Sequence, residues 1–226
     1  MRILGIDTSG KTASVAILDT EKKILLGEHS IYTARTHSQV IMPMCKDLLC
    51  ECNMMVQDVD GFAVSVGPGS YTGIRIGIAA VQGMAMVNQT PCAGVSTLAA
   101  LASRAGSGNI LALVHAREDL FYYGIYDFEN GIIPAGTLAD HAEILNILEN
   151  YAGRMTLTGD GAELFMQNYA EEIPDSLEIS LTPPALRLQS AAGICTCAAI
   201  TGFGTPADLT ANYLQAVQIQ KKKTDK

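Results

Sequence analysis

The stretch of sequence that decides the fold is RILGIDTSGKTASVAIL, residues 2–18. Residues 2–7 have the pattern of a short strand that ends in the carboxylate of Asp7, and residues 12–18 predict a second strand. The turn between them carries small hydroxyl side chains beside that aspartate. A third strand is expected over residues 23–32, so the chain is predicted to begin as an antiparallel meander.

Alternating helices and strands are expected after the meander. Apolar residues recur at helix spacing over residues 39–52, and Pro43 fits only the first turn of a helix, so we expect this helix to begin near Gln39. The remaining elements predicted in the first half are a strand, a helix, a strand and a short helix, at residues 60–66, 74–87, 91–95 and 97–104.

The second half repeats this order. Small residues without an apolar anchor make 105–109 the best candidate linker. Beyond it we expect strands at 110–115, 121–128 and 131–138, a helix at 141–148, a strand at 155–158 and a helix from 159 to 169. An irregular proline-containing stretch and a helix from 183 to about 200 follow.

The chain is therefore predicted to be an α/β protein with two related β-β-β-α-β-α domains and mixed sheets. We place the first domain at residues 1–105, the second at 106–210, and a C-terminal tail at 211–226. This repeated unit is the organisation expected of an actin-like ATPase (ASKHA, ribonuclease-H-like) fold.

Composition limits the classes of function. The 226 residues include 15 Lys+Arg and 23 Asp+Glu, which gives a net charge of −8, and four of the basic residues lie in the last six positions. Such acidity argues against this chain binding nucleic acid alone, because phosphate contacts need clustered Lys and Arg. With 48% apolar and 17% charged residues, we expect buried surface beyond an ordinary core, at a subunit interface.

Targeting and metal signals are weak. No signal-peptide pattern precedes the first strand, and residues 191–200 fall short of the roughly 20 apolar residues that span a bilayer, so we expect a cytoplasmic protein without membrane contact. The two Cys-x-Cys pairs lie in helical patterns and point apart, and His29, His37, His115 and His141 are scattered. We therefore predict no metal site and no catalytic residues.

Two turns nevertheless carry the residue types of anion sites. Asp7, Thr8 and Ser9 predict either a phosphate turn of the actin-like type or a polar hairpin turn that satisfies its own backbone donors. The glycine-rich run 67–77 could bring amides and Arg75 to an anion, but it is not a Walker loop. We favour close helix packing for this run instead.

Two helices have the surface expected of a partner interface. Gly73, Gly77, Ala80 and Met84 fall on one helical face and would let another helix approach closely. The apolar face of helix 39–52, which includes Ile41, Met44 and Leu48, is wider than one core contact requires. Either a partner or a neighbouring helix of the same chain could cover it.

Four motifs together resemble the TsaB (YeaZ) family. They are Ile6-Asp7-Thr8-Ser9, Thr36-His37-Ser38-Gln39, the block Gly67-Pro68-Gly69-Ser70-Tyr71-Thr72-Gly73-Ile74-Arg75-Ile76-Gly77, and Gly94-Val95-Ser96-Thr97-Leu98. The glycine-rich block is highly specific, and all four occur in the family's order. The resemblance is firm over residues 1–105 and thin over the second half.

The resemblance implies an actin-like fold without an active site of its own. It implies a scaffold or activating subunit of the complex that transfers threonylcarbamoyl from threonylcarbamoyl-AMP to the adenosine next to the anticodon of tRNA. The implied partners are the catalytic paralogue TsaD, the small ATPase TsaE and, in a homodimer, a second copy; tRNA is reached only through the complex. No cofactor of its own is implied, although ATP or ADP could bind at a subunit interface.

Docking in the family uses the two N-domain helices, so the resemblance points to Ile41, Met44, Leu48, Gly73, Arg75, Gly77, Ala80 and Met84. We expect Gly77→Arg to block docking and leave the fold intact. The alternative is an independent actin-like kinase or ATPase for a small molecule, with Gly159-Asp160-Gly161 as its second phosphate loop.

Three departures from the family pattern leave the role of the second half open. His115-Ala116-Arg117 stands where the family usually has Asp-Ala-Arg, and Gln39 stands where glutamate is common. Residues 211–215, Ala-Asn-Tyr-Leu-Gln, replace the usual Pro-x-Tyr-Leu-Arg and end in Gln215.

Overall fold

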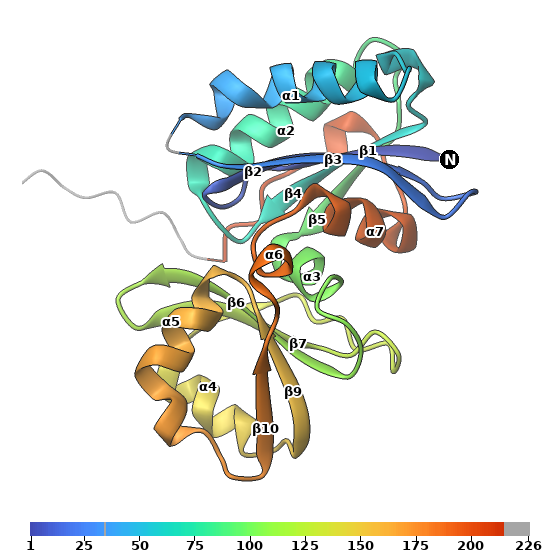
Figure 1. Ribbon diagram of the computed structural model, residues 1–226. Helices are drawn as coiled ribbons and strands as arrows, with labels where there is room; N and C mark the ends of the chain where they lie inside the picture. The colour runs from blue at the N-terminus through green and yellow to red at the C-terminus, as the bar shows by residue number, and fades with distance from the viewer. Residues whose placement is uncertain (34, 215–226) are drawn as a thin grey trace, which may run out of the picture.

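The computed structural model describes residues 1–33 and 35–214, which form two lobes, each built on a five-stranded mixed sheet (Figure 1). In the first lobe β1 pairs antiparallel with β2 and parallel with β4, and the sheet order is β3-β2-β1-β4-β5. Its elements are β1 (Arg2–Asp7), β2 (Thr12–Asp19), β3 (Ile24–Tyr32), α1 (His37–Glu51), β4 (Gly61–Gly67), α2 (Tyr71–Ala85), β5 (Cys92–Ser96) and α3 (Thr97–Ala102).

The second lobe repeats this order as β8-β7-β6-β9-β10, with β6 antiparallel to β7 and parallel to β9. The predicted duplication of a mixed-sheet unit is therefore confirmed. The elements are β6 (Asn109–Arg117), β7 (Leu120–Tyr126), β8 (Thr137–Asp140), α4 (His141–Leu148), β9 (Gly153–Thr158), α5 (Asp160–Tyr169), β10 (Leu177–Leu181), α6 (Pro184–Arg187) and α7 (Ala191–Thr201).

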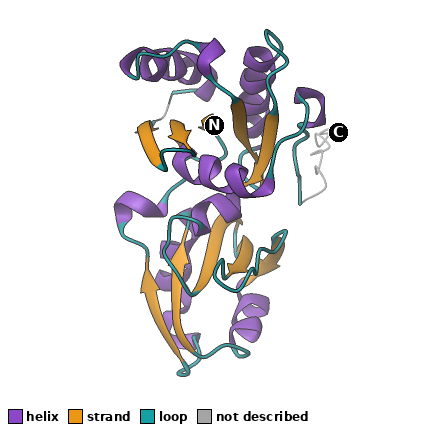
Figure 2. Cartoon of the chain, turned by 90° about the vertical axis from the view of Figure 1, so that its right-hand side faces the viewer, coloured by secondary structure: helices purple, strands orange, loops and turns teal. Residues whose placement is uncertain are grey.

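Three apolar clusters hold these layers together. Helices α1 and α2 cover the outer face of the first sheet, α4 and α5 cover the outer face of the second, and α3 and α7 lie between the lobes (Figures 1 and 2). The inner cluster contains Ile3 and Ala16 from the first sheet and Ile110 from the second. The two sheets thus share one inner core.

Small residues allow α7 to lie close to the first sheet. A Cβ atom at Gly5 would lie 2.5 Å from the Cys195 Sγ atom and 2.8 Å from the Ala191 carbonyl oxygen. Helix α7 packs on β1 and β2, although it lies in the predicted second domain, and α3 packs on β6 and β7. The boundary proposed after residue 105 stays a prediction.

Several predicted elements need correction. Helix α1 begins at His37, and Pro43 lies in its second turn, so the helix tolerates one missing backbone N–H there. The strand predicted at 131–138 is confined to Thr137–Asp140, because the chain first turns at Asp127, whose carboxylate accepts the amides of the two residues after Phe128.

The stretch before Pro183, expected to be irregular, contains β10, a short edge strand beside β9. The single helix predicted from 183 to about 200 is two helices, because Leu188 is extended and the Ser190 side chain caps α7 by accepting the Ala192 amide.

The last described residues return to the first lobe. Gly204 bridges Cys92 at the edge of β5, Leu209 is buried, and the Asn212 amide donates to the Val66 carbonyl at 2.7 Å. Gln215 and the lysines at 221–223 and 226 lie outside the described residues. None of the helices within 1–33 and 35–214 is long and apolar enough to cross a membrane.

Candidate functional site

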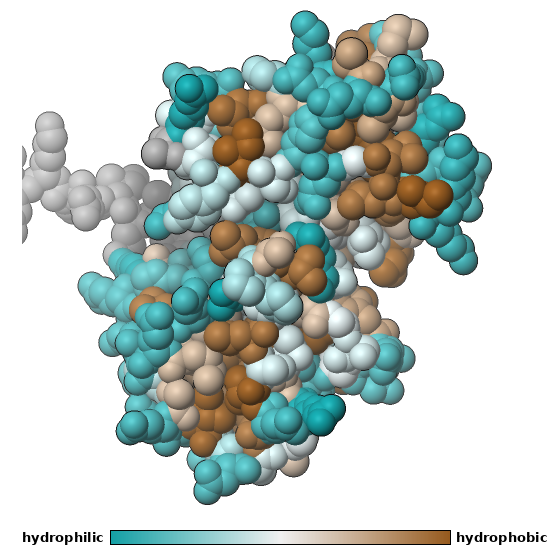
Figure 3. Space-filling model, in the orientation of Figure 1, coloured by the Kyte–Doolittle hydropathy of each residue, from teal (hydrophilic) through white to brown (hydrophobic). Residues whose placement is uncertain are grey.

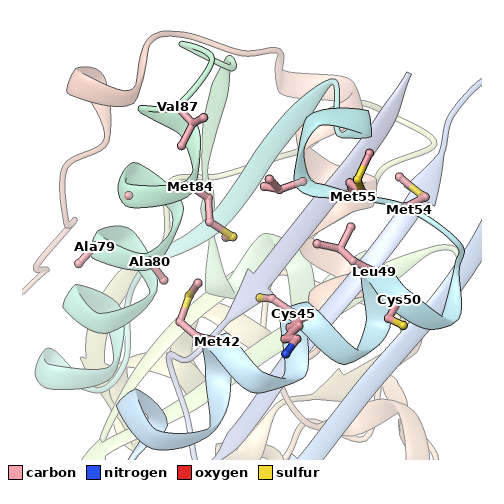
Figure 4. Close-up of a pocket in the computed structure, with 13 residues that line it drawn as sticks. Met42, Cys45, Leu49, Cys50, Met54, Met55, Ala79, Ala80, Met84 and Val87 are labelled. Atoms are coloured by element: carbon pink, nitrogen blue, oxygen red, sulfur yellow. The ribbon is translucent and has the colours of Figure 1, made fainter.

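An apolar groove with a volume of about 690 Å³ lies between α1 and α2. Its walls come from both helices and from the connection after α1 (Figure 4). Four methionines line it, Met42, Met54, Met55 and Met84, together with the small residues Ala79, Ala80 and Gly83. Among the described residues that form its walls, Lys46 alone carries a charge.

The groove is exposed apolar surface rather than core. The exposed fraction is 45% for Met42 and 67% for both Met55 and Val87. Contiguous apolar surface of this kind marks an interaction site, and methionine adapts its shape to a partner. The small residues on α2 leave room for a helix to approach the groove closely.

The structure divides the interface residues predicted on α1 and α2 into two groups. Ala80 and Met84 line the groove. Ile41, Met44 and Leu48 are buried beneath α1 in the outer core of the first lobe. Their side chains stabilise α1 on its sheet. A direct partner contact by these three stays a prediction.

Two glycines of α2, Gly73 and Gly77, face inward. A Cβ atom at Gly73 would lie 2.0 Å from the Thr8 carbonyl oxygen, and one at Gly77 would lie 2.5 Å from the Thr8 Oγ1 atom. Their small size therefore brings α2 onto β1 and its turn. The expectation that Gly77→Arg leaves the fold intact is corrected accordingly, because an arginine there has no space. Ala80 and Met84, predicted on the same face, line the groove, so the predicted stripe divides between a contact with the first lobe's own turn and the groove.

The Asp7-Thr8-Ser9 turn is fully buried and bonded to itself. The Asp7 Oδ1 atom accepts the Ser9 amide at 2.9 Å and the Ser9 hydroxyl at 2.6 Å, and the Thr8 hydroxyl donates to the Gly73 carbonyl at 2.7 Å. The Asp7 Oδ2 atom is buried without a hydrogen-bond partner among the described residues. Desolvation by burial raises the pKa of Asp7.

The two predicted phosphate loops meet at a cavity between the lobes. This cavity of about 330 Å³ is lined by Ser9 and Gly10 on one side and by His115 and Asp160 on the other. Burial raises the pKa of Asp160 as well. The Gln189 side chain packs against Gly10, where a Cβ atom would lie 2.4 Å from it. The first loop is thus partly covered by this chain's own side chain.

His37 lies at the start of α1 with its Nε2 atom buried and without a partner in the described part of the chain. Burial lowers the pKa of His37, while the Asp7 carboxylate opposes that shift. Of the two Cys-x-Cys pairs, Cys195 and Cys197 are buried, whereas Cys50 is exposed and Cys52 is half-buried. The described residues contain no cluster of His, Cys, Asp and Glu that could hold a metal ion.

Arg75 is exposed on α2 and does not line the groove. Its guanidinium stacks on Tyr71 and bonds to Tyr213 near the end of the described chain. All three residues belong to motifs that are visible in the sequence. The contact of Arg75 with Tyr213 nevertheless joins positions 138 residues apart, so no local spacing indicates it.

The family model described as TsaD: tRNA N6-adenosine threonylcarbamoyltransferase matches residues 28–150 of this chain. A protein of Buchnera aphidicola (subspecies Schizaphis graminum), called tRNA threonylcarbamoyladenosine biosynthesis protein TsaB, is 32% identical over 167 residues, which are 70% of this chain and 78% of that protein. The TsaB proteins of Bacillus subtilis and Escherichia coli are 37% and 39% identical, but the matched part of this chain spans only 58% of the length of each.

Among solved structures, YeaZ from Pseudomonas aeruginosa superposes with a TM-score of 0.74 at 29% identity, covering 94% of this chain and 99% of that one. The ethanolamine utilization protein EutJ from Carboxydothermus hydrogenoformans reaches a TM-score of 0.53 at 10% identity, which shows a shared fold alone. These likenesses, with the repeated sheet order, confirm the predicted actin-like α/β class.

Proposed function

Because this chain belongs to the TsaB family, we propose that it serves the synthesis of N6-threonylcarbamoyladenosine in tRNA as a non-catalytic scaffold or activating subunit. In this proposal a TsaD-like paralogue transfers the threonylcarbamoyl group from threonylcarbamoyl-AMP, and a TsaE-like ATPase completes the complex in the cytoplasm. The acidic chain, with a net charge of −8, contributes protein surface and meets tRNA only through the complex.

The observation that carries this proposal is the open apolar groove between α1 and α2. A TsaD-like partner is the occupant we favour, because the TsaD family model matches residues 28–150, the part of the chain that contains both helices. A protein with a related domain would carry an equivalent pair of helices. Two such pairs can pack face to face over Ala80, Gly83 and the methionines.

The hydrogen bonds within the Asp7-Thr8-Ser9 turn support a non-catalytic role for this subunit. A phosphate at this turn would need free donors, but the Ser9 amide and hydroxyl are already engaged by Asp7. We therefore propose that any nucleotide site of the complex lies at the boundary between this chain and another subunit.

Gly83→Arg tests the proposal, because Gly83 lines the groove and a Cβ atom built there has no neighbour within 4 Å. We expect the variant to fold normally, since replacing a helical glycine favours the helix by up to about 1 kcal/mol. It should no longer co-elute with the TsaD-like paralogue of the same organism in size-exclusion chromatography. Gly83→Ala is the matched control and should co-elute as the wild type does.

If Gly83→Arg co-elutes with the paralogue at the same stoichiometry as the wild type, the groove is not the docking surface. The competing occupant of the groove is a second copy of this chain. It predicts a dimer of the isolated protein by light scattering that Gly83→Arg dissociates, without any binding of the paralogue.

One observation favours the alternative, an independent kinase or ATPase: the Ser9 and Asp160 loops line the same cavity. In that function the purified chain should hydrolyse ATP by itself, and Asp7→Ala should abolish hydrolysis. Absence of turnover by the wild-type chain, together with paralogue binding, would leave the scaffold proposal standing.

A further inference from the structure

Arg75 is held in place by two tyrosines on the surface of the first lobe. Its guanidinium carbon lies 4.0 Å from the centre of the Tyr71 ring, and its Nε atom donates to the Tyr213 hydroxyl at 2.8 Å. The two tyrosine rings are themselves 4.8 Å apart. An exposed arginine ordinarily samples many rotamers, so this stacking removes freedom that binding would otherwise have to remove.

Tyr213 can act in this way because the chain before it is anchored. The Asn212 amide donates to the Val66 carbonyl at 2.7 Å, and Leu209 is buried in the outer core of the first lobe. The Gln82 side chain of α2 donates to the Pro206 carbonyl at 3.0 Å. The segment from Pro206 to Tyr213 therefore runs along α2 as a fixed strap.

Among the described residues, no carboxylate balances the charge of Arg75. In residues 1–33 and 35–214, no ion pair includes Arg75, and Nε is the one guanidinium nitrogen with a hydrogen bond. The two terminal nitrogens are the pair that an arginine uses to grip a carboxylate side on. Within the described part of the chain their donors are free, and the net charge of the whole chain is −8.

The recess beside this cation adjoins the apolar groove through a shared residue. Arg75, Ala79 and Tyr213 line a shallow recess of about 310 Å³, and Ala79 also lines the groove between α1 and α2. We infer that Arg75 recognises an Asp or Glu carboxylate of the paralogue that fills the groove, with Tyr213 as the positioning residue. The inference rests on the proposed function, to which it adds the charge that the partner must present.

Affinity measurements with the purified chain and the paralogue test the role of Arg75. Arg75→Ala should weaken binding about 30-fold, because it leaves the partner's carboxylate unpaired in the interface. It should also reduce the salt dependence of the dissociation constant, which a loss of packing alone would not do. Arg154→Ala is the matched control: Arg154 is an exposed arginine of the second lobe, paired with Glu178, and its removal should change affinity by less than about twofold.

Tyr213→Phe tests positioning, because it keeps the ring and removes only the hydroxyl. We expect about fivefold weaker binding. The same change should have no effect once Arg75 is alanine, since Tyr213 acts through the guanidinium. An equal loss in both backgrounds would overturn the positioning role and indicate a structural contribution of Tyr213.

A cross-link identifies the partner group directly. Arg75→Lys places a primary amine where the guanidinium lay, and a carbodiimide joins an amine to a carboxylate only when the two touch. We expect a cross-linked peptide between position 75 and an acidic residue of the paralogue, and none from the wild type at this position.

One outcome would overturn this inference and leave the proposed function intact. In that outcome Arg75→Ala binds the paralogue with unchanged affinity, whereas Gly83→Arg no longer binds it. A cross-link from position 75 to another copy of this chain would overturn it as well. Failure of the wild-type chain to bind the paralogue would overturn the inference and the proposed function together.

Discussion

The outer faces of the two lobes have the same strand order beneath them but different surfaces. On the first lobe, two helices of 15 residues each leave an apolar groove with Met42 and Met55 exposed. On the second, helices of 8 and 10 residues pack over an aromatic core. The Phe121 and Phe165 rings lie 5.6 Å apart, and His141 stacks on Tyr169 at 4.2 Å.

Apolar residues are visible on both lobes in Figure 3, but those on α4 and α5, such as Ile147 and Leu164, are half-buried against their core. Among the described residues, no large apolar side chain of α4 or α5 is strongly exposed. The same topology thus yields a sealed face or an open apolar groove, and the choice lies with side-chain type. Rigid aromatic rings fill the space beneath short helices, whereas methionines remain on the surface of long ones.

The largest effect should come from breaking the sealed face. Phe165 is fully buried among aromatic neighbours, so Phe165→Ala should lower the free energy of unfolding by about 3–5 kcal/mol. Urea denaturation measures this loss. Binding of the paralogue by the fraction that remains folded should be unchanged; a loss of that binding would show that the second lobe also supports docking.

A smaller loss is expected beneath the open face. Gly77→Ala places a methyl group 2.5 Å from the Thr8 Oγ1 atom and should destabilise the fold by about 1–3 kcal/mol through overpacking. Thermal unfolding measures it. Gly83→Ala, on the groove side of the same helix, is the internal comparison and should raise the stability slightly.

Asp7→Asn, in the buried turn of the first lobe, should change how the stability of the protein depends on pH. Burial raises the pKa of Asp7 in the folded state, so its contribution to stability is complete at pH values below the unfolded pKa and is lost as the pH rises through the folded pKa. The asparagine removes this loss. The stability of the variant relative to the wild type should therefore be higher at pH 7 than at pH 4, measured by denaturation at both values; a constant difference would contradict the buried titration.

The smallest change in stability is expected on the docking face itself. Met42 is 45% exposed, so Met42→Gln should change the free energy of unfolding by less than about 0.5 kcal/mol. Calorimetric titration with the paralogue should nevertheless show weaker binding, because a polar amide replaces apolar contact area. Equal affinity of this variant and the wild type would place Met42 outside the contact.

The sequence pattern predicts the first lobe well because strand alternation and helix periodicity are strong there. The second lobe is harder to predict. Strand β10 is short and follows Pro174, and the break between α6 and α7 depends on the capping bond of Ser190, a detail that apolar spacing does not contain. To predict whether a glycine of α2 faces the sheet or a partner, one also needs the register of α2 against β1.

The sequence predicts only those groove residues that belong to the apolar pattern of a single helix. Ala80 and Met84 line the groove as part of a pattern on α2. Met54 and Met55 line it from the connection after α1, where periodicity carries no information. The contact of Arg75 with Tyr213 depends on a C-terminal strap returning to α2, which only the assembled fold reveals.

The exchange of α3 and α7 between the lobes has a consequence for synthesis of the protein. A nascent chain that ends before residue 191 has both groove helices, α1 and α2, and all five strands of the first sheet, but the inner face of β1 and β2 lacks its helix. Ile3 and Ala16 then lack the α7 residues, such as Ile194, that share their cluster. The first lobe thus begins the chain but is completed only by α7, which is synthesised after all five strands of the second lobe.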